Sequence, residues 1–520
     1  MTGWLATVLL AVQFASAPRE NSLLIRGGTV LDGLGSKPRR ADVRIEGKRI
    51  AAVAKLRARP GEVVIDASGL MIAPGFIDAH SHADVGVSDR PMLESQIRQG
   101  ITTAIVGQDG GGSSPISELF ARLESARPAL NFAAFAGHGR IRQRVLGEGY
   151  KRHATKSEIE RMRSLLEADM RGGALGLSTG LEYDPGFYST AGEIVALAKV
   201  AAKHGGIYIS HMRDEGNNAE KSFEELIRIA EEARIPAQVS HIKLATASVW
   251  GKAQHILAKI ESARKRGLDV TADVYPYLYW QSTITVLTLD RNWSDRRVWE
   301  RALEDVGGPS RVLLSEYSPD RAWVGKTLAE IASDTGKDPV SVIQEIVRKT
   351  HGPDGAGRES IVCTSMEERD LHKWMRWPHA MFCSDGRDGG THPRGAGAFP
   401  RVLGKYVRQE KVLSLAEAVR KMTSLPARRF GLTGRGVLRP GSIADVVVFD
   451  PAIIADTATP QNPTSYSVGV KHVFVNGVPV LREGAMTGER PGLILKPSDR
   501  VILQRRLNQM AVPRPAADRL

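Results

Sequence analysis

The segment GFIDAHSHAD, residues 75–84, places His80 and His82 one residue apart where an apolar run ends. Alternate side chains of a β-strand point to the same side, so both imidazoles can face a single metal ion. Imidazole nitrogens are frequent ligands of zinc and related divalent ions. An isolated His-x-His pair also fits a strand that simply ends in polar residues, so the remainder of the chain must decide.

Further ionisable residues follow other apolar runs in the middle of the chain. They share a position at the predicted carboxyl end of a strand, and they are Asp109, His138, Glu182, His211, His241 and Asp385. Histidines and carboxylates together suit Zn²⁺ or a related ion. One or two such ions would activate water and polarise a scissile carbonyl group. The pattern therefore predicts that His80 and His82 are metal ligands.

The strands that must position these residues alternate with helical stretches such as ELFARLESA. Eight apolar runs of strand type occur in this region, at residues 75–82, 102–110, 131–139, 173–183, 207–215, 237–243, 269–277 and 380–386. Alternation of strand and helix indicates right-handed βαβ units and a parallel sheet. Eight units predict an α/β fold of the (β/α)8 TIM-like barrel type, in which catalytic groups gather at the carboxyl ends of the strands.

Both ends of the chain have a different pattern, with short β-branched runs broken by Gly-containing turns. Residues 22–73 and 426–495 are expected to pair into one small β-sandwich domain, with the barrel, residues 74–425, inserted between them. The stretch 278–379 between the seventh and eighth strands is longer than one βα unit requires, and two helices are predicted in it around a Gly-Lys-Asp-Pro break. An insertion there falls on the active-site face, where it could form a lid.

The composition is that of an ordinary globular protein of 520 residues, with 71 basic and 58 acidic side chains and a net charge of +13. The basic residues are spread along the chain and no nucleic-acid-binding motif accompanies them, so an anionic small substrate is a better partner than nucleic acid. Two cysteines, Cys363 and Cys383, cannot form a disulfide framework or a thiolate zinc cluster. The sequence has neither a P-loop nor the Gly-x-Ser-x-Gly elbow of serine hydrolases.

Residues 1–17 resemble a secretory signal peptide, with a short apolar stretch and a small-residue site at Ala15-Ser16-Ala17. The absence of an N-terminal positive charge and the presence of Pro18 also fit an apolar extension that stays on the protein. The stretch is too short to span a membrane, so stable membrane insertion is not expected. A periplasmic or secreted protein is expected if this segment is cleaved, and a cytoplasmic one otherwise. Residues 496–520 form a basic tail.

The order of these residues resembles the amidohydrolase superfamily, with His-x-His on the first strand, histidines on the fifth and sixth, and aspartate on the eighth. More narrowly, the chain is similar to the N-acyl-D-amino-acid deacylases (D-aminoacylases). The motifs that carry this likeness are PGFIDAHSHAD, GHGRIR, GLSTGLEYDPG, SHMRDEG, SDGRDGGTHPRGAGAFPRVLGKYVR and LPARRFGLTGRGVLRPGSIADVVVFDP. The likeness runs from about residue 22 to residue 495.

The resemblance implies a role for each matching residue. His80, His82, His211 and His241 would ligate zinc, and Asp385 would contact the metal and act as base and then as acid. Three further residues, Lys243, Tyr275 and Arg394, would hold the carboxylate of an N-acyl amino acid. A guanidinium suits this task because it can bind a carboxylate through two parallel hydrogen bonds.

The chain departs from the family pattern after the second strand. Where those enzymes have a cysteine in a Gly-Asn-Cys-Gly turn, this sequence reads GQDGGGSSP and has Asp109. Asp109 could replace the thiolate as a ligand, or Glu182 could bridge two ions as a modified lysine or a glutamate does elsewhere in the superfamily. No lysine occurs at the end of the fourth strand, so we expect Glu182 to bridge, with Asp109 beside it.

Three functions compete at this point. The first is metal-dependent hydrolysis of the amide bond of N-acyl-D-amino acids. The second is hydrolysis of cyclic amides, as in dihydroorotases and hydantoinases, which use a similar metal site. Arg394 favours the open-chain substrate with its carboxylate. The third, a catalytically inactive barrel, would predict the loss of ligand residues, and none is missing.

Overall fold

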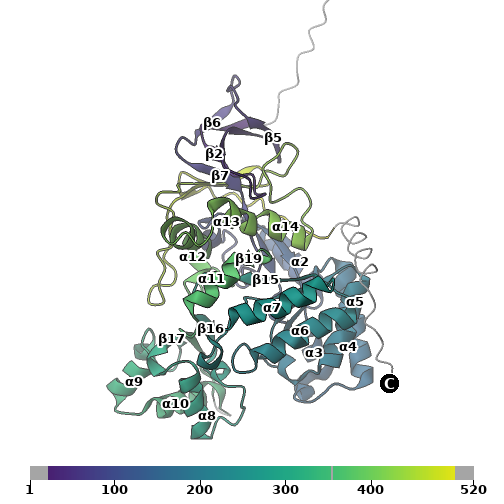
Figure 1. Ribbon diagram of the computed structural model, residues 1–520, viewed down its shortest axis with the longest axis vertical. Coiled ribbons are helices and arrows are strands. Elements are labelled where there is room, and N and C mark those ends of the chain that lie inside the picture. The colour runs from purple at the N-terminus through teal and green to yellow at the C-terminus, as the bar shows by residue number, and fades with distance from the viewer. Residues whose placement is uncertain (1–21, 353–354, 498–520) are drawn as a thin grey trace, which may run out of the picture.

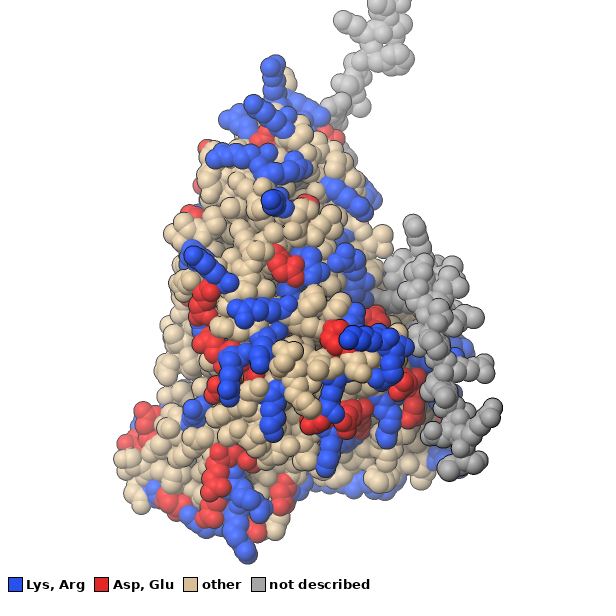
Figure 2. Space-filling model, viewed as in Figure 1, with Lys and Arg blue, Asp and Glu red and all other residues tan. Residues whose placement is uncertain are grey.

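The computed structural model describes residues 22–352 and 355–497. The predicted signal segment 1–17 and residues 498–520 of the predicted basic tail lie outside the described residues. Within the described part, no helix has the length and apolar character needed to cross a membrane. Figure 2 shows Lys and Arg distributed over the visible face, as their spread along the sequence predicts.

Parallel strands form the centre of the molecule, and each of the eight predicted runs contains one or two of them. They are β8 (Phe76–Asp78), β9 (Ile101–Val106), β10 (Asn131–Ala134), β11 (Ala136–Gly137), β12 (Gly176–Gly180), β13 (Ile207–His211), β14 (Ala237–Val239), β15 (Val270–Val274) and β19 (Ala380–Phe382). Two parallel sheets result, in the orders β8-β9-β10 and β11-β12-β13-β14-β15-β19. Their residues are buried, as in parallel sheets covered on both faces.

The two outer strands of this arrangement, β8 and β19, share no ladder among the described residues, but the segments that follow them are hydrogen-bonded. Ala79 donates its backbone N–H to the carbonyl of Phe382 at 3.4 Å, and Asp385 donates to the carbonyl of His80 at 2.8 Å. The carboxyl ends of the first and last parallel strands therefore lie side by side, which brings their ionisable residues together. At the other junction between the two sheets, only Phe135 separates β10 from β11.

Helices that follow the strands cover the sheets (Figure 1). They are α1 (Glu94–Ile97), α2 (Ile116–Ala126), α3 (His138–Leu146), α4 (Lys156–Gly172), α5 (Ala191–Lys203), α6 (Ala219–Ala233), α7 (Ala253–Lys265), α11 (Glu368–Arg376), α12 (Arg394–Arg401), α13 (Leu415–Met422) and α14 (Ser424–Phe430). Helix α4 shows why a helix begins and ends where it does. Thr155 and Glu158 form a capping box at its start, and Gly173 ends it with a φ of 109°. Its buried residues Met162 and Leu166 lie one turn apart on one face.

Residues 22–74 and 446–486 meet in two mixed sheets at one end of the molecule (Figure 1). One sheet has the order β5-β4-β1-β6 and contains β1 (Ser22–Arg26), β4 (Asp42–Glu46), β5 (Arg49–Ala54) and β6 (Val63–Asp66). The other has the order β23-β22-β21-β20-β7-β2-β3 and contains β2 (Thr29–Val30), β3 (Arg39–Arg40), β7 (Met71–Pro74), β20 (Val446–Phe449), β21 (Val470–Val475), β22 (Val478–Arg482) and β23 (Ala485–Met486). Strand β7 pairs with β20, with Ala73 opposite Val447. Buried residues of both sheets form one core.

The expected boundary at residue 426 falls inside α14, so helix rather than strand occupies the first residues of the segment 426–495. The sequence LPARRFG carries the helix, and Gly431, with a φ of 73°, ends it. The β-strands of this segment begin only at Val446.

The segment 278–379 contains a separate layer of structure at the opposite end of Figure 1. Its antiparallel sheet has the order β16-β18-β17, with β16 (Trp280–Ser282), β17 (Val312–Tyr317) and β18 (Glu359–Cys363). Three helices accompany the sheet: α8 (Arg296–Asp305), α9 (Leu328–Thr335) and α10 (Pro339–His351). The two helices predicted around the Gly-Lys-Asp-Pro break are α9 and α10, and Asp338 caps α10 through the backbone N–H groups of Val340 and Ser341.

Candidate active site

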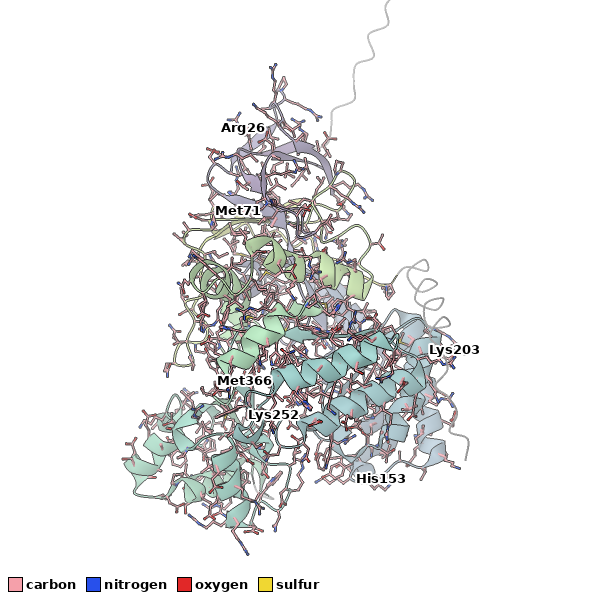
Figure 3. The ribbon with its side chains drawn as sticks, in the orientation of Figure 1. Arg26, Met71, His153, Lys203, Lys252 and Met366 are labelled. Atoms are coloured by element: carbon pink, nitrogen blue, oxygen red, sulfur yellow. The ribbon has the colours of Figure 1, made fainter. Side chains whose placement is uncertain are left out.

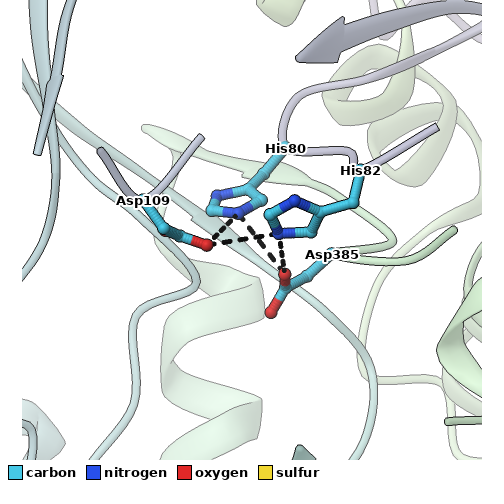
Figure 4. Close-up of side chains that lie close together, drawn as sticks. All are labelled: His80, His82, Asp109 and Asp385. Carbon is cyan, nitrogen blue, oxygen red and sulfur yellow. Dashed lines mark hydrogen bonds and ion pairs between the residues drawn. The ribbon is translucent and has the colours of Figure 1, made fainter. Parts of the chain in front are cut away.

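Two histidines and two aspartates converge beyond the ends of β8, β9 and β19 (Figure 4). The Nε2 atoms of His80 and His82 each lie 3.2 Å from Oδ2 of Asp109. The same two nitrogens lie 3.4 Å and 3.2 Å from Oδ1 of Asp385. One potential ligand atom from each of the four residues lies within 4.8 Å of the others, which is close enough for all of them to contact one ion.

A second group adjoins the first through Asp109. Its Oδ1 atom lies 3.4 Å from Nε2 of His241, and this nitrogen lies 3.0 Å from Nδ1 of His211. Asp109 is therefore positioned between the His80–His82 pair and the His211–His241 pair. A carboxylate in such a position can contact two ions at once.

The outward-facing ring nitrogens of three histidines lie close to carboxylates. Nδ1 of His80 lies 3.6 Å from Asp273, Nε2 of His211 lies 2.7 Å from Glu182, and Nδ1 of His241 lies 3.2 Å from Glu215. Metal-ligating histidines characteristically donate this second N–H to a carboxylate, which fixes the tautomer that offers a lone pair to the metal. The arrangement therefore fits a metal centre. The inner atom Oδ1 of Asp109 is buried and has no hydrogen-bond partner in the described part of the chain, which also fits a missing ligand.

The position between the two histidine pairs is taken by Asp109, and a separate candidate ligand group with His211 and Glu215 includes Glu182. Its Oε2 atom contacts the outward nitrogen of His211, and Glu215 lies on the same side. Asp109 occupies the inner position because the GQDGGG loop turns sharply there, with Asp109 itself at a φ of 53°. This turn decides that Asp109, and not Glu182, lies between the two histidine pairs.

A pair of variants tests the assignment of these carboxylates. We expect Asp109→Asn to lower the metal content of the purified protein more than Glu182→Gln does, because only Asp109 faces both histidine pairs. Loss of its negative charge removes the attraction for both cations. Metal analysis of the two isosteric variants gives the comparison, and a greater loss in Glu182→Gln would return the bridging role to Glu182.

Burial and mutual contact shift the protonation of this cluster. Burial by itself would raise the pKa of Asp109, but His80 and His241 bring it well below its usual range. Burial likewise opposes ionisation of Asp385, whereas Arg394 and His80 lower its pKa well below the usual range. Both aspartates are therefore ionised near neutral pH and can contact a cation.

Arg394 lies directly against Asp385, with 2.6 Å between Nη1 and Oδ2. Its guanidinium also stacks over the ring of Tyr275 at 4.9 Å from the centroid. Lys243 donates to Glu215 at 2.6 Å and lies 2.7 Å from Nδ1 of His241. The three residues predicted to hold a carboxylate are thus all within the site, but Lys243 and Arg394 contact acidic partners of the protein itself.

A cavity of about 850 Å³ opens onto this cluster. Lys243, Arg394 and Asp385 line it, whereas Tyr275 is buried and does not. The Tyr275 hydroxyl faces the sulfur of Met366 at 3.9 Å, and Figure 3 places Met366 where the insertion rejoins the central region. Tyr275 therefore supports Arg394 from behind, which differs from the predicted direct contact with substrate.

The insertion forms the other wall of the cavity, on the active-site face as expected. It contributes both polar and apolar side chains, and the apolar ones include Trp280, Val286, Leu287 and Leu289. Since these side chains face the metal-site residues across the cavity, they can contact the apolar part of a substrate.

Two acidic residues of the site were not predicted from the sequence. Glu215 occurs in SHMRDEG four residues after His211, and Asp273 lies on β15 two residues before Tyr275. Asp273 accepts a hydrogen bond from the backbone of His241 at 2.7 Å. The strand periodicity that identified His80 and His82 applies equally to Asp273 and Tyr275 and could have identified this acid.

His138, a strand-end residue in the sequence, does not join the cluster. It is fully buried with its Nε2 atom 2.8 Å from Glu193, whose other oxygen accepts a hydrogen bond from buried Arg142.

We expect Glu193→Gln to lower the free energy of unfolding by about 3–5 kcal/mol, because it leaves the buried Arg142 guanidinium without its counter-ion. Urea unfolding measures the effect. The exposed pair Arg163–Glu160 is the control, and Glu160→Gln should leave the stability nearly unchanged; equal effects would contradict the prediction.

Comparison with known proteins tests the resemblance that these motifs carry. The family model described as "Amidohydrolase family" matches residues 63–282 and 377–481. The chain belongs to the amidohydrolase family. The unmatched stretch between the two matched parts, residues 283–376, falls within the insertion of this amidohydrolase.

Its similar relatives are deacylases of Alcaligenes xylosoxydans xylosoxydans. A D-aminoacylase is 37% identical, with 91% of this chain and 97% of the relative covered, and an N-acyl-D-glutamate deacylase is 38% identical, with 91% and 96% covered. An N-acyl-D-aspartate deacylase is 34% identical, with 93% and 97% covered. Within the family, this amidohydrolase therefore groups with the N-acyl-D-amino-acid deacylases.

A solved deacylase structure supports the same grouping. An N-acyl-D-glutamate deacylase from Bordetella bronchiseptica, in complex with zinc and a phosphonate mimic of the tetrahedral intermediate, has a TM-score of 0.81 and 34% identity, with 92% of this chain and all of that chain covered. A dihydropyrimidinase from Brevibacillus agri NCHU1002 has a TM-score of 0.56 and 17% identity, with 92% and 99% covered. The second likeness shows the fold alone.

Proposed function

We propose that this amidohydrolase uses zinc to hydrolyse the amide bond of N-acyl-D-amino acids, releasing a carboxylate and a free D-amino acid. The observation that carries the proposal is the placement of the histidine–aspartate cluster and Arg394 in one cavity. The deacylases that resemble this chain over most of their length support the substrate class.

The donor set has two parts. His80, His82, Asp109 and Asp385 would hold one Zn²⁺, and Asp109, His211 and His241 would hold a second. When bound, such ions polarise the amide carbonyl and favour deprotonation of water. The protein supplies the remaining chemistry: Asp385 takes a proton from the attacking water and delivers it to the amide nitrogen as the C–N bond breaks.

Recognition of the substrate carboxylate falls to Arg394 and Lys243, the two cations of the cavity wall nearest the cluster. In this structure both are neutralised by Asp385 and Glu215. A substrate carboxylate would share or replace these contacts. The insertion residues would then face the acyl group or the amino-acid side chain.

The fold that supports this site is proposed to be a single (β/α)8 barrel inserted in a β-sandwich. Support for the barrel comes from the consecutive order of the parallel strands and from the hydrogen bonds between the segments after β8 and β19. Support for the sandwich comes from the shared core of the two mixed sheets.

A substrate panel on metal-loaded protein tests the function. We expect N-acetyl-D-amino acids to be hydrolysed in preference to their L-enantiomers and to hydantoins, and activity to fall on chelation and return with Zn²⁺. Metal analysis of the same sample gives the zinc content. Turnover of hydantoins or dihydroorotate without turnover of acyl amino acids would assign the site to cyclic-amide hydrolysis instead.

A further inference from the structure

A second cavity, of about 620 Å³, lies at the opposite ends of the parallel strands from the active site. Its wall includes Ile207 at the start of β13, Pro236 before β14 and Asp269 before β15. By contrast, His211 is the last residue of β13, and His241 follows β14. The two cavities share no lining residue, so the second one is separate from the substrate site.

The charge of this cavity is strongly positive. Its ionisable lining residues are five arginines and one aspartate, namely Arg234, Arg428, Arg429, Arg435, Arg439 and Asp269. Arg429 pairs with Asp269 at 2.9 Å, and Arg435 pairs with Asp445. No such partner occurs in the described residues for the guanidinium groups of Arg234, Arg428 and Arg439. The cavity therefore has three cations that its own wall does not neutralise.

A buried hydroxyl in the same wall has no partner. Ser424 is 3% exposed, and its Oγ atom makes no hydrogen bond to any described residue. Leaving a buried hydroxyl unpaired costs free energy, which an acceptor oxygen in the cavity would recover. Burial, the main cause, lowers the pKa of the Arg429 guanidinium, while Asp269 opposes the shift and Arg264 adds to it.

Most other side chains of the wall are apolar. Ile207, Ile235, Leu268 and Leu432 line the cavity and are nearly inaccessible to solvent. The volume is within the range of small-molecule sites, about 300–1,000 Å³. Guanidinium groups bind phosphate oxygens through paired hydrogen bonds, and more than one unpaired guanidinium matches a doubly charged anion better than a single carboxylate.

We propose that this arginine-lined cavity is a second binding site, which takes a soluble organic phosphate monoester. The phosphate lies among the unpaired arginines and accepts a hydrogen bond from Ser424. The organic part lies against the apolar wall. The site is distinct from the deacylase reaction and does not depend on the substrate assigned above.

Calorimetric titration of the full, metal-loaded chain with phenyl phosphate, inorganic phosphate, benzoate and phenol tests the proposal. We expect phenyl phosphate to bind most tightly, because it alone has both the dianion and the apolar body. The double variant Arg234→Gln/Arg428→Gln should weaken this binding at least tenfold, and Ser424→Ala should weaken it less. Arg428 is exposed and Arg234 half-buried, so both substitutions are compatible with folding.

Arg161→Gln is the matched control, since Arg161 is an exposed arginine on α4 outside the cavity. All three variants should keep the parent kcat/KM for deacylation, which separates this site from the metal centre. Equal affinity for phenyl phosphate in the double variant and in Arg161→Gln would overturn the proposal, and so would benzoate binding as tightly as phenyl phosphate. If the protein sediments with phosphatidic acid vesicles but does not bind phenyl phosphate, the arginines bind a lipid headgroup, and the proposal of a soluble ligand is overturned.

Discussion

Asp385→Asn should lower kcat for N-acyl-D-amino acid hydrolysis by about 10²–10⁴-fold, the contribution of a positioned acid–base group. The asparagine amide has a similar volume but cannot accept the proton of the attacking water. Asp385 has a φ of 50°, a left-handed conformation that asparagine also tolerates, so the variant should fold. Steady-state kinetics and a thermal melt, compared with the parent, measure both parts of this prediction.

Asp385 also belongs to the proposed donor set, so the metal content of the variant must be measured alongside its rate. If activity stays within about tenfold of the parent at equal metal content, Asp385 is not the proton shuttle. If the metal is lost, kinetics at saturating Zn²⁺ distinguishes the role as ligand from the role as base.

Arg394→Met should lower kcat/KM for an N-acyl-D-amino acid roughly 30- to 1,000-fold. This loss corresponds to about 2–4 kcal/mol of transition-state stabilisation, the scale of a paired charge-assisted contact. The change should matter much less for the corresponding N-acyl-D-amino acid amide, which lacks the carboxylate. The comparison of the two substrates is decisive because Arg394 also contacts Asp385 at 2.6 Å.

An effect through Asp385 would slow both substrates alike, since the pKa of the base would rise in either case. An equal loss for both would therefore make Arg394 a positioning residue for Asp385 and would remove its role in recognition. Arg394→Lys is the conservative control. It retains the charge but not the planar pair of donors, so it should recover only part of the loss.

The candidate ligand histidines could be identified from the sequence because they lie at or just beyond the carboxyl ends of the apolar strands β8, β13 and β14. In the predicted barrel the parallel strands present their carboxyl ends on the same side, so local patterns at His80, His211 and His241 were sufficient to place them together. The chain-end pairing could be expected for a similar reason, from matching β-branched runs at both ends.

Other features depended on distances that local patterns do not encode. Whether Asp109 or Glu182 lies between the histidine pairs depends on a left-handed turn at Asp109. The contact of Arg394 with Asp385 depends on the loop that leads into α12. The burial of His138 against Glu193 joins two helices through residues far apart in the sequence, so its strand-end position was misleading.

The pairing of β7 with β20 has a consequence for synthesis of the protein. Strand β7 leaves the ribosome early, but the strand that completes its hydrogen bonding is made only after the whole central region. Until then Met71–Pro74 has neighbours on one side only, and an unpaired strand edge promotes aggregation. A chain shortened before Val446 would keep every residue of the metal site and still accumulate as insoluble protein, because the missing strand protects that edge.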